Sequence, residues 1–66
     1  MKAYHIGSSF GGHIDQLVAV EMVKAAGGIF IRQSPVMHGG FYVRAPEGIA
    51  AELELTEVPD NHPYLS

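Results

Sequence analysis

The sequence predicts a small α+β domain built as one βαβββ module, with a mixed four-stranded sheet and a single helix. Four stretches carry the alternating or β-branched pattern of strands, and one stretch between the first two carries the pattern of a helix. The chain has 66 residues, which is room for one domain. The predicted order of elements is therefore strand, helix, strand, strand, strand.

Residues 2–8 form the first predicted strand, because their side chains alternate in character. In that alternation His5 lies on one face, and Tyr4 and Ile6 lie on the other. Residues 8–12 are rich in glycine and serine and predict a loop.

Residues 16–26 form the predicted helix, with Asp15 as its N-cap and Gly27 in the left-handed conformation just after its end. One side of this helix is apolar, and we expect it to face the core; it carries Ile14, Val18, Met22, Ala25 and Ala26. The other side is polar, although two apolar residues, Leu17 and Val20, also fall there. These two are either ordinary surface residues, which is the interpretation we favour, or part of a second contact surface.

The second half of the chain predicts three more strands, at residues 29–34, 41–45 and 49–57. They form an antiparallel meander, and the first strand joins their sheet after a right-handed crossover through the helix. In the closing strand Glu52 and Glu54 lie on the helix-free face, which they would share with His5.

The predicted domain therefore has two parts. Residues 1–57 form the half-module, and residues 58–66 form an irregular C-terminal tail with two prolines and little periodicity. A chain this small buries only about 60% of the surface that its unfolded form exposes. Without cysteine there is no disulfide to compensate, so a metal, a partner or self-association is expected.

Composition excludes several classes of protein. The formal net charge is −3, and the four cationic side chains are scattered along the chain, so no basic face for nucleic acid is expected. No apolar stretch approaches 18 residues, so no membrane span is expected, and no signal peptide is seen. We expect a cytoplasmic protein.

His5 and Glu52 are the first candidates for chemistry. If the first and last strands are neighbours, imidazole and carboxylate converge, and this pair suits a divalent cation such as Fe, Mn, Ni, Zn or Co. Two ligands are too few for a tight site, but a two-fold homodimer would supply two of each. From spacing alone, a hydrogen-bonded pair on a solvated face is the favoured alternative.

Three stretches of the chain resemble one module of the vicinal oxygen chelate superfamily, which includes glyoxalase I, bleomycin-resistance proteins and extradiol dioxygenases. They are the opening His-Ile-Gly at residues 5–7, Val-Lys-Ala-Ala-Gly-Gly at 23–28, and Ala-Pro-Glu-Gly at 45–48 followed by Ala-Glu-Leu at 51–53. Ala45 and Ile49 depart from the aspartate and asparagine usual in the last stretch. The likeness spans residues 3–56.

The resemblance implies that His5 and Glu52 are metal ligands, with Glu54 a weaker candidate. It also implies that a second copy of the chain completes a cup that the family usually builds from two modules. If the protein is an enzyme, it would be glyoxalase-like or dioxygenase-like, a lyase or an oxidoreductase. Its metal would then polarise vicinal oxygens of the substrate, and Glu52 or Glu54 would move protons.

Arg44 and Tyr42 are the candidate substrate-binding residues. A guanidinium suits carboxylates and phosphates, and Tyr42 shares the strand parity of Arg44. The expected function is thus a homodimeric, metal-dependent or simply small-molecule-binding protein of the vicinal oxygen chelate type. The alternatives are a metal-free, drug-sequestering protein and a non-catalytic module that depends on a partner.

Overall fold

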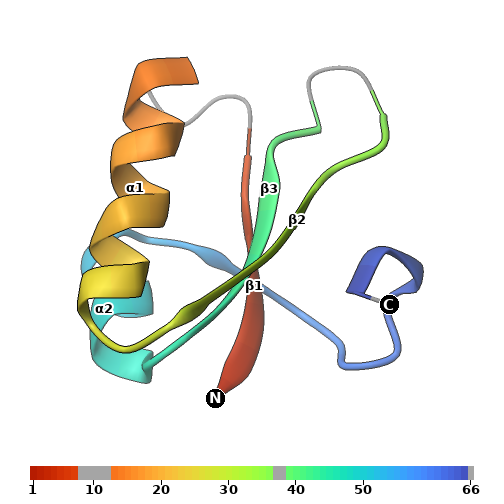
Figure 1. Cartoon of the computed structure of the whole chain (residues 1–66). Coiled ribbons are helices and arrows are strands. Elements are labelled where there is room, and N and C mark those ends of the chain that lie inside the picture. The colour runs from red at the N-terminus through yellow and green to blue at the C-terminus, as the bar shows by residue number, and fades with distance from the viewer. Residues whose placement is uncertain (8–12, 37–38, 66) are drawn as a thin grey trace.

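A computed structural model describes residues 1–7, 13–36 and 39–65, with the side chains of residues 13 and 14 also left out. Its elements, in chain order, are β1 (Lys2–Ile6), α1 (His13–Ala25), β2 (Ile29–Gln33), β3 (Phe41–Ala45), α2 (Glu47–Glu52), β4 (Thr56–Val58) and a 3-10 turn, η1 (Pro63–Leu65). The predicted loop at residues 8–12 lies outside the described residues. Figure 1 shows both helices on one side of the sheet and η1 on the other.

The four strands form one sheet in the order β2-β3-β1-β4, and each neighbouring pair is antiparallel. The α+β class and the four-stranded sheet are confirmed, whereas the expectation of a mixed sheet is wrong. β1 and β2 run parallel with β3 between them, and β3 and β4 run parallel with β1 between them. The chain is therefore two interleaved βαβ units, the split βαβ arrangement of ferredoxin-like folds.

The predicted meander is wrong at its last strand. Residues 49–57 do not form one strand: α2 ends at Glu52, and the short β4 crosses to the far side of β1. Alternation misled here because Ile49, Ala50 and Leu53 also fit a helical spacing, and all three pack on the core. Alanine and glutamate favour helix over strand, which decides between the two periods.

The core lies between the helices and one face of the sheet. Its largest fully buried side chains are Ile6 on β1, Val23 on α1 and Val43 on β3. The remaining buried members of the cluster are Tyr4, Ala19, Val20, Phe41, Ala45 and Ala50.

Helix α1 is turned the other way from the prediction. Val20 is buried, and Gln16 is buried with its amide donating to the Gly7 carbonyl at 2.8 Å. Val18 and Met22, expected in the core, are instead 52% and 38% exposed. The prediction for Ile14 lies outside the described side chains. The helix is apolar on both sides, so periodicity alone could not orient it.

The predicted end of α1 is confirmed. Gly27 has a φ of 94°, and the Gly28 amide donates to the Val23 carbonyl at 2.8 Å while the Gly27 amide donates to Lys24 at 3.1 Å. This is a Schellman cap, in which a left-handed residue satisfies the last carbonyls. Asp15, the predicted N-cap, lies inside the first turn.

Helix α2 ends in the same way but without glycine. The Leu55 amide donates to the Ala50 carbonyl at 2.9 Å, and the Glu54 amide donates to Ala51 at 3.1 Å. Glu54 occupies the left-handed position, with a φ of 55°. A side chain there costs conformational energy that glycine would not.

Among the described residues no helix is long and apolar enough to cross a membrane.

Candidate functional site

The candidate site is the helix-free face of the sheet. Cross-strand partners point to the same face, and His5 pairs with Tyr42 on one side and with Thr56 on the other. Arg44 lies two residues beyond Tyr42 and shares its face. The predicted placement of His5 on the helix-free side is therefore confirmed. Tyr42 and Arg44, whose face the strand parity alone left open, lie on the same side, although no binding role follows from placement alone.

Aromatic and imidazole rings gather on this face. The centroids of His5 and Tyr42 are 4.8 Å apart, and the C-terminal segment adds His62 at 5.2 Å and Tyr64 at 5.9 Å from Tyr42. These four residues, His5, Tyr42, His62 and Tyr64, are called the ring cluster below. The tail residues cover Tyr42 so far that only 6% of it is exposed.

The Tyr42 hydroxyl nonetheless reaches solvent. It makes no hydrogen bond with the described residues. No described side-chain nitrogen or oxygen that is shut off from solvent lacks a partner. The hydroxyl therefore keeps some contact with solvent, where a ligand can replace water.

His5 is held in one tautomer. Its Nε2 lies against the Gly39 carbonyl oxygen, which can only accept, so Nε2 carries the proton. In the neutral ring Nδ1 is then left as an acceptor or metal ligand. The supporting loop needs glycine at Gly40, where φ is 76° and a Cβ would collide with the Ile6 carbonyl oxygen.

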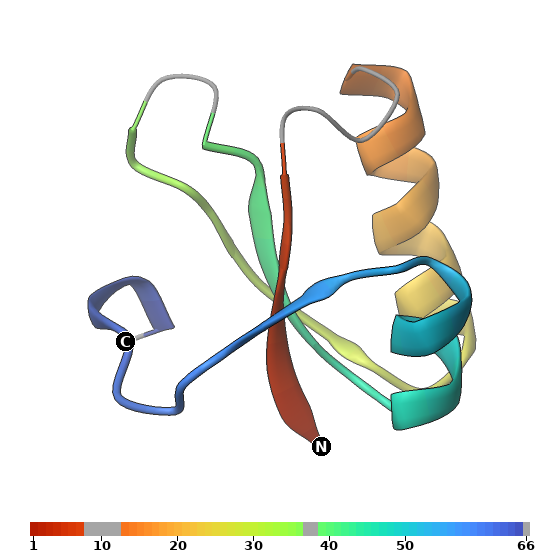
Figure 2. The ribbon, with the colours of Figure 1, turned by 180° about the vertical axis from the view of Figure 1, so that it is seen from behind.

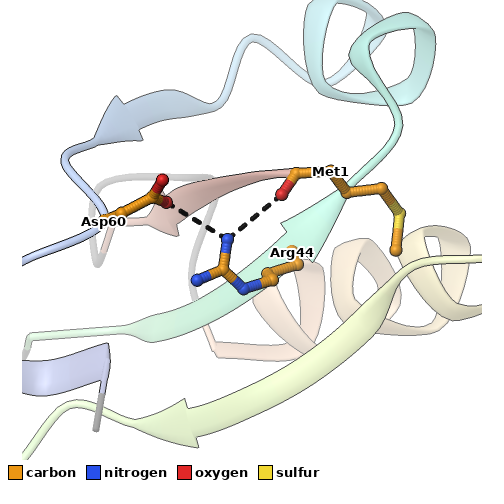
Figure 3. A network of polar contacts seen from close by, with 3 residues as sticks. All are labelled: Met1, Arg44 and Asp60. Atoms are coloured by element: carbon orange, nitrogen blue, oxygen red, sulfur yellow. Dashed lines mark hydrogen bonds and ion pairs between the residues drawn. The ribbon is translucent and has the colours of Figure 1, made fainter.

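Arg44 is anchored at the margin of the face. Its Nη1 donates to the Met1 carbonyl at 3.1 Å and to the Asp60 carboxylate at 3.2 Å, as Figure 3 shows. The anchor joins the start of β1 to the tail after β4. Arg32 pairs with Tyr42 from β2 and lies on the same face. Its Nε donates to the Gln33 carbonyl at 3.3 Å.

Glu52 and Glu54 are not on this face, and the expectation that they share it with His5 is wrong. Glu52 is exposed on α2, a helix that packs through Ala50 on the opposite side of the sheet. Glu54 follows in the cap of the same helix. Both lie off the predicted face because residues 47–52 form a helix, so the two-residue period of a strand does not hold through this segment.

Within one chain the sheet therefore separates His5 from Glu52. No group of three or more His, Cys, Asp or Glu side chains in the described part of the chain could hold a metal ion. The metal roles of His5 and Glu52, and the catalytic roles of Glu52 and Glu54, stay predictions without support from this geometry.

Sequence reasoning missed the tail residues of the site. His62 and Tyr64 fold back on Tyr42, and the Tyr64 amide donates to His62 Nδ1 at 3.2 Å. The available signal was compositional, since a histidine and a tyrosine stand beside Pro63 in a segment otherwise treated as irregular.

Comparison with protein-family models, with curated proteins and with solved structures finds no match.

Proposed function

We propose that this chain is a small-molecule-binding module whose ligand lies on the helix-free face of the sheet. The observation that carries the proposal is the ring cluster. Imidazole and phenol rings with solvent-open polar atoms meet there beside the guanidinium groups of Arg32 and Arg44. A flat, anionic compound fits this chemistry, because rings stack on its plane and donors meet its charge.

Two polar groups within the ring cluster can form hydrogen bonds with such a ligand. The Tyr42 hydroxyl is open to it as a donor, and His5 Nδ1 is free to accept, because Nε2 is occupied by Gly39. A compound with adjacent hydroxyl and carboxylate oxygens would meet both. This keeps the vicinal-oxygen character of the expected substrate while requiring no metal.

The metal-dependent alternative has one specific observation in its favour. Metal-binding histidines usually donate their second ring nitrogen to a carbonyl or carboxylate, as His5 does to Gly39. Further ligands would then have to come from a second copy whose sheet faces this one. Zn²⁺, Ni²⁺ or Mn²⁺ would in that case act as a Lewis acid on the ligand's oxygens.

We further propose that the protein is a homodimer joined through the outer side of α1. Leu17, Val18 and Met22 are exposed there by 45%, 52% and 38%, the side opposite the core. Glu21 and Lys24 lie beside them, 3.5 Å apart. In an antiparallel two-fold pair, Glu21 of each copy meets Lys24 of the other while the apolar residues are buried. Such a dimer leaves the ring cluster free for ligand.

The binding proposal is tested by titrating ¹⁵N-labelled protein with salicylate and following amide shifts. We expect shifts centred on His5, Tyr42 and Thr56. Tyr42→Phe should weaken binding about 3- to 10-fold, since it removes one hydrogen bond to an anion. The matched control is Tyr4→Phe, the same change at a residue of equal 6% exposure on the other face. Equal weakening by both variants, or shifts away from the cluster, would contradict the proposal.

The metal-dependent and metal-free functions are distinguished by adding Zn²⁺ or Ni²⁺ to protein that a chelator has freed of metal. Salicylate binding that persists in the chelator supports the metal-free function. A rise in melting temperature with either ion that His5→Ala abolishes supports the alternative.

The dimer is tested by size-exclusion chromatography with light scattering, which measures the molar mass of the protein in solution. Val18→Glu should give a monomer, whereas Val36→Glu, at a residue 51% exposed on a loop, should stay dimeric. A monomeric wild type, or a dimer that survives Val18→Glu, would contradict the α1 interface.

A further inference from the structure

A hollow lies between β1, α2 and β4, on the opposite side of the sheet from the ring cluster. Its volume is about 240 Å³, and three carboxylates and one phenol line it: Glu47, Glu54, Glu57 and Tyr4. Ala50 and Leu55 form its apolar wall. The residues come from all three elements because Glu57 pairs with Tyr4 across β4 and β1, while α2 packs beside them.

Tyr4 is a polar side chain of the core whose hydroxyl has no partner. It is 6% exposed, and it makes no hydrogen bond with the described residues. Since no described side-chain oxygen shut off from solvent lacks a partner, the hydroxyl is not sealed in the core. Tyr4 is one of the residues that line the hollow, so its side chain is a candidate partner for a ligand bound there.

Glu54 is held at the hollow in a conformation that glycine would adopt more easily. Its φ of 55° corresponds to that of Gly27 in the cap of α1, where the chain does use glycine. Strained residues cluster at functional sites, and Glu54 is one of the residues that line the hollow.

The charge of the hollow is negative. Glu57 is paired with Lys2 at 3.5 Å, across the exposed margin of the sheet. Glu47 and Glu54 make no ion pair with the described residues. A hollow with carboxylates on its lining and an apolar wall suits an organic cation.

We propose that this hollow binds an organic ammonium group with a short apolar body. The ammonium lies between the Glu47 and Glu54 carboxylates and donates to them and to the Tyr4 hydroxyl oxygen, which accepts. The apolar body lies on Ala50 and Leu55. A water molecule occupies about 30 Å³ of liquid, so the hollow has room for an alkyl ammonium of several heavy atoms. This site is separate from the one on the helix-free face and does not depend on it.

The test is an amide-shift titration of the intact protein with n-butylammonium chloride. Sodium chloride at equal ionic strength and sodium butyrate, which has a similar apolar body but a negative charge, are the reference titrations. We expect saturable shifts at Tyr4, Glu47, Glu54 and Leu55 with the ammonium only. Glu54→Gln, which removes the charge and keeps the size, should weaken binding about 5-fold or more, the loss typical of a charge-assisted hydrogen bond.

The matched control is Glu52→Gln on the same helix, because Glu52 is exposed and does not line the hollow. It should leave ammonium binding unchanged within about 2-fold, as expected of a screened surface charge. Tyr4→Phe should weaken ammonium binding, and Tyr42→Phe should not. Equal loss in Glu54→Gln and Glu52→Gln, or equal shifts with butyrate or sodium chloride, would overturn the proposal. Because the salicylate titration tests the helix-free face and the butylammonium titration tests the hollow, either proposal can be contradicted without affecting the other.

Discussion

The two faces of the sheet differ in burial and in the chemistry of their side chains. One face carries Ile6 and Val43 under the helices and is sealed by apolar contact. The other face carries His5 and Arg44, and among the described residues only the C-terminal segment lies over it. The difference teaches that adjacent residues of one strand can have different roles, because successive side chains of β1 point to opposite faces of the sheet. Burial stabilises one face, and the other carries the polar atoms to which we propose that a ligand binds.

The largest expected effect comes from Ile6→Ala on the helix-covered face. Ile6 is fully buried, so removing its side chain should cost ~2–5 kcal/mol through lost burial and a cavity. His5→Ala, one residue away on the other face, should cost about 1 kcal/mol, the worth of one hydrogen bond. Urea unfolding followed by circular dichroism measures both. Similar losses from the two variants would break the division between the faces.

Glu54→Gly should have a smaller effect of opposite sign. Glycine relieves the left-handed conformation at φ 55°, and we expect the free energy of unfolding to rise by about 1 kcal/mol. The same variant should lose ammonium binding, because it removes the carboxylate. Glu52→Gly, within α2, should instead lower stability by about 0.5 kcal/mol. A destabilising Glu54→Gly would mean that its side chain, rather than its backbone, supports the cap.

Asp60→Asn should have the smallest effect. The Arg44–Asp60 pair is at the surface, with the Asp60 side chain 81% exposed, and Arg44 keeps its bond to the Met1 carbonyl. We expect a loss of no more than about 0.5 kcal/mol, and one that disappears at high salt. Unfolding curves at low and high ionic strength measure it. A larger loss that salt does not reduce would show that the tail contributes to stability as the core does.

Much of the fold could be predicted because its local signals agree. The strands at residues 29–34 and 41–45 and the glycine end of α1 are confirmed almost residue for residue. In each case propensity, periodicity and turn residues point to the same element. The first strand, and with it the face of His5, followed from the same agreement, whereas the face of Tyr42 depended on a strand register that the sequence left open.

The rest depended on packing that no local pattern reports. Residues 49–57 fit both periods, and contact of Ala50 and Leu53 with the core, together with the helix propensity of alanine and glutamate, selects the helix at residues 47–52. Helix α1 has apolar residues on every side, so its buried side is decided by the sheet it meets. The return of His62 to Tyr42 joins residues far apart in the chain, which a reading of neighbours cannot foresee.

The position of β1 in the middle of the sheet has a consequence for biosynthesis. β1 leaves the ribosome before both of its partners in the sheet, because β3 and β4 come later in the sequence. Until those residues emerge, Tyr4 and Ile6 have no strand to pair beside and no complete core to enter. Strand pairings between residues this far apart in the sequence form slowly, so the unpaired edges of β1 are exposed to aggregation until then. We expect a chaperone that binds β1 to raise the yield of folded protein.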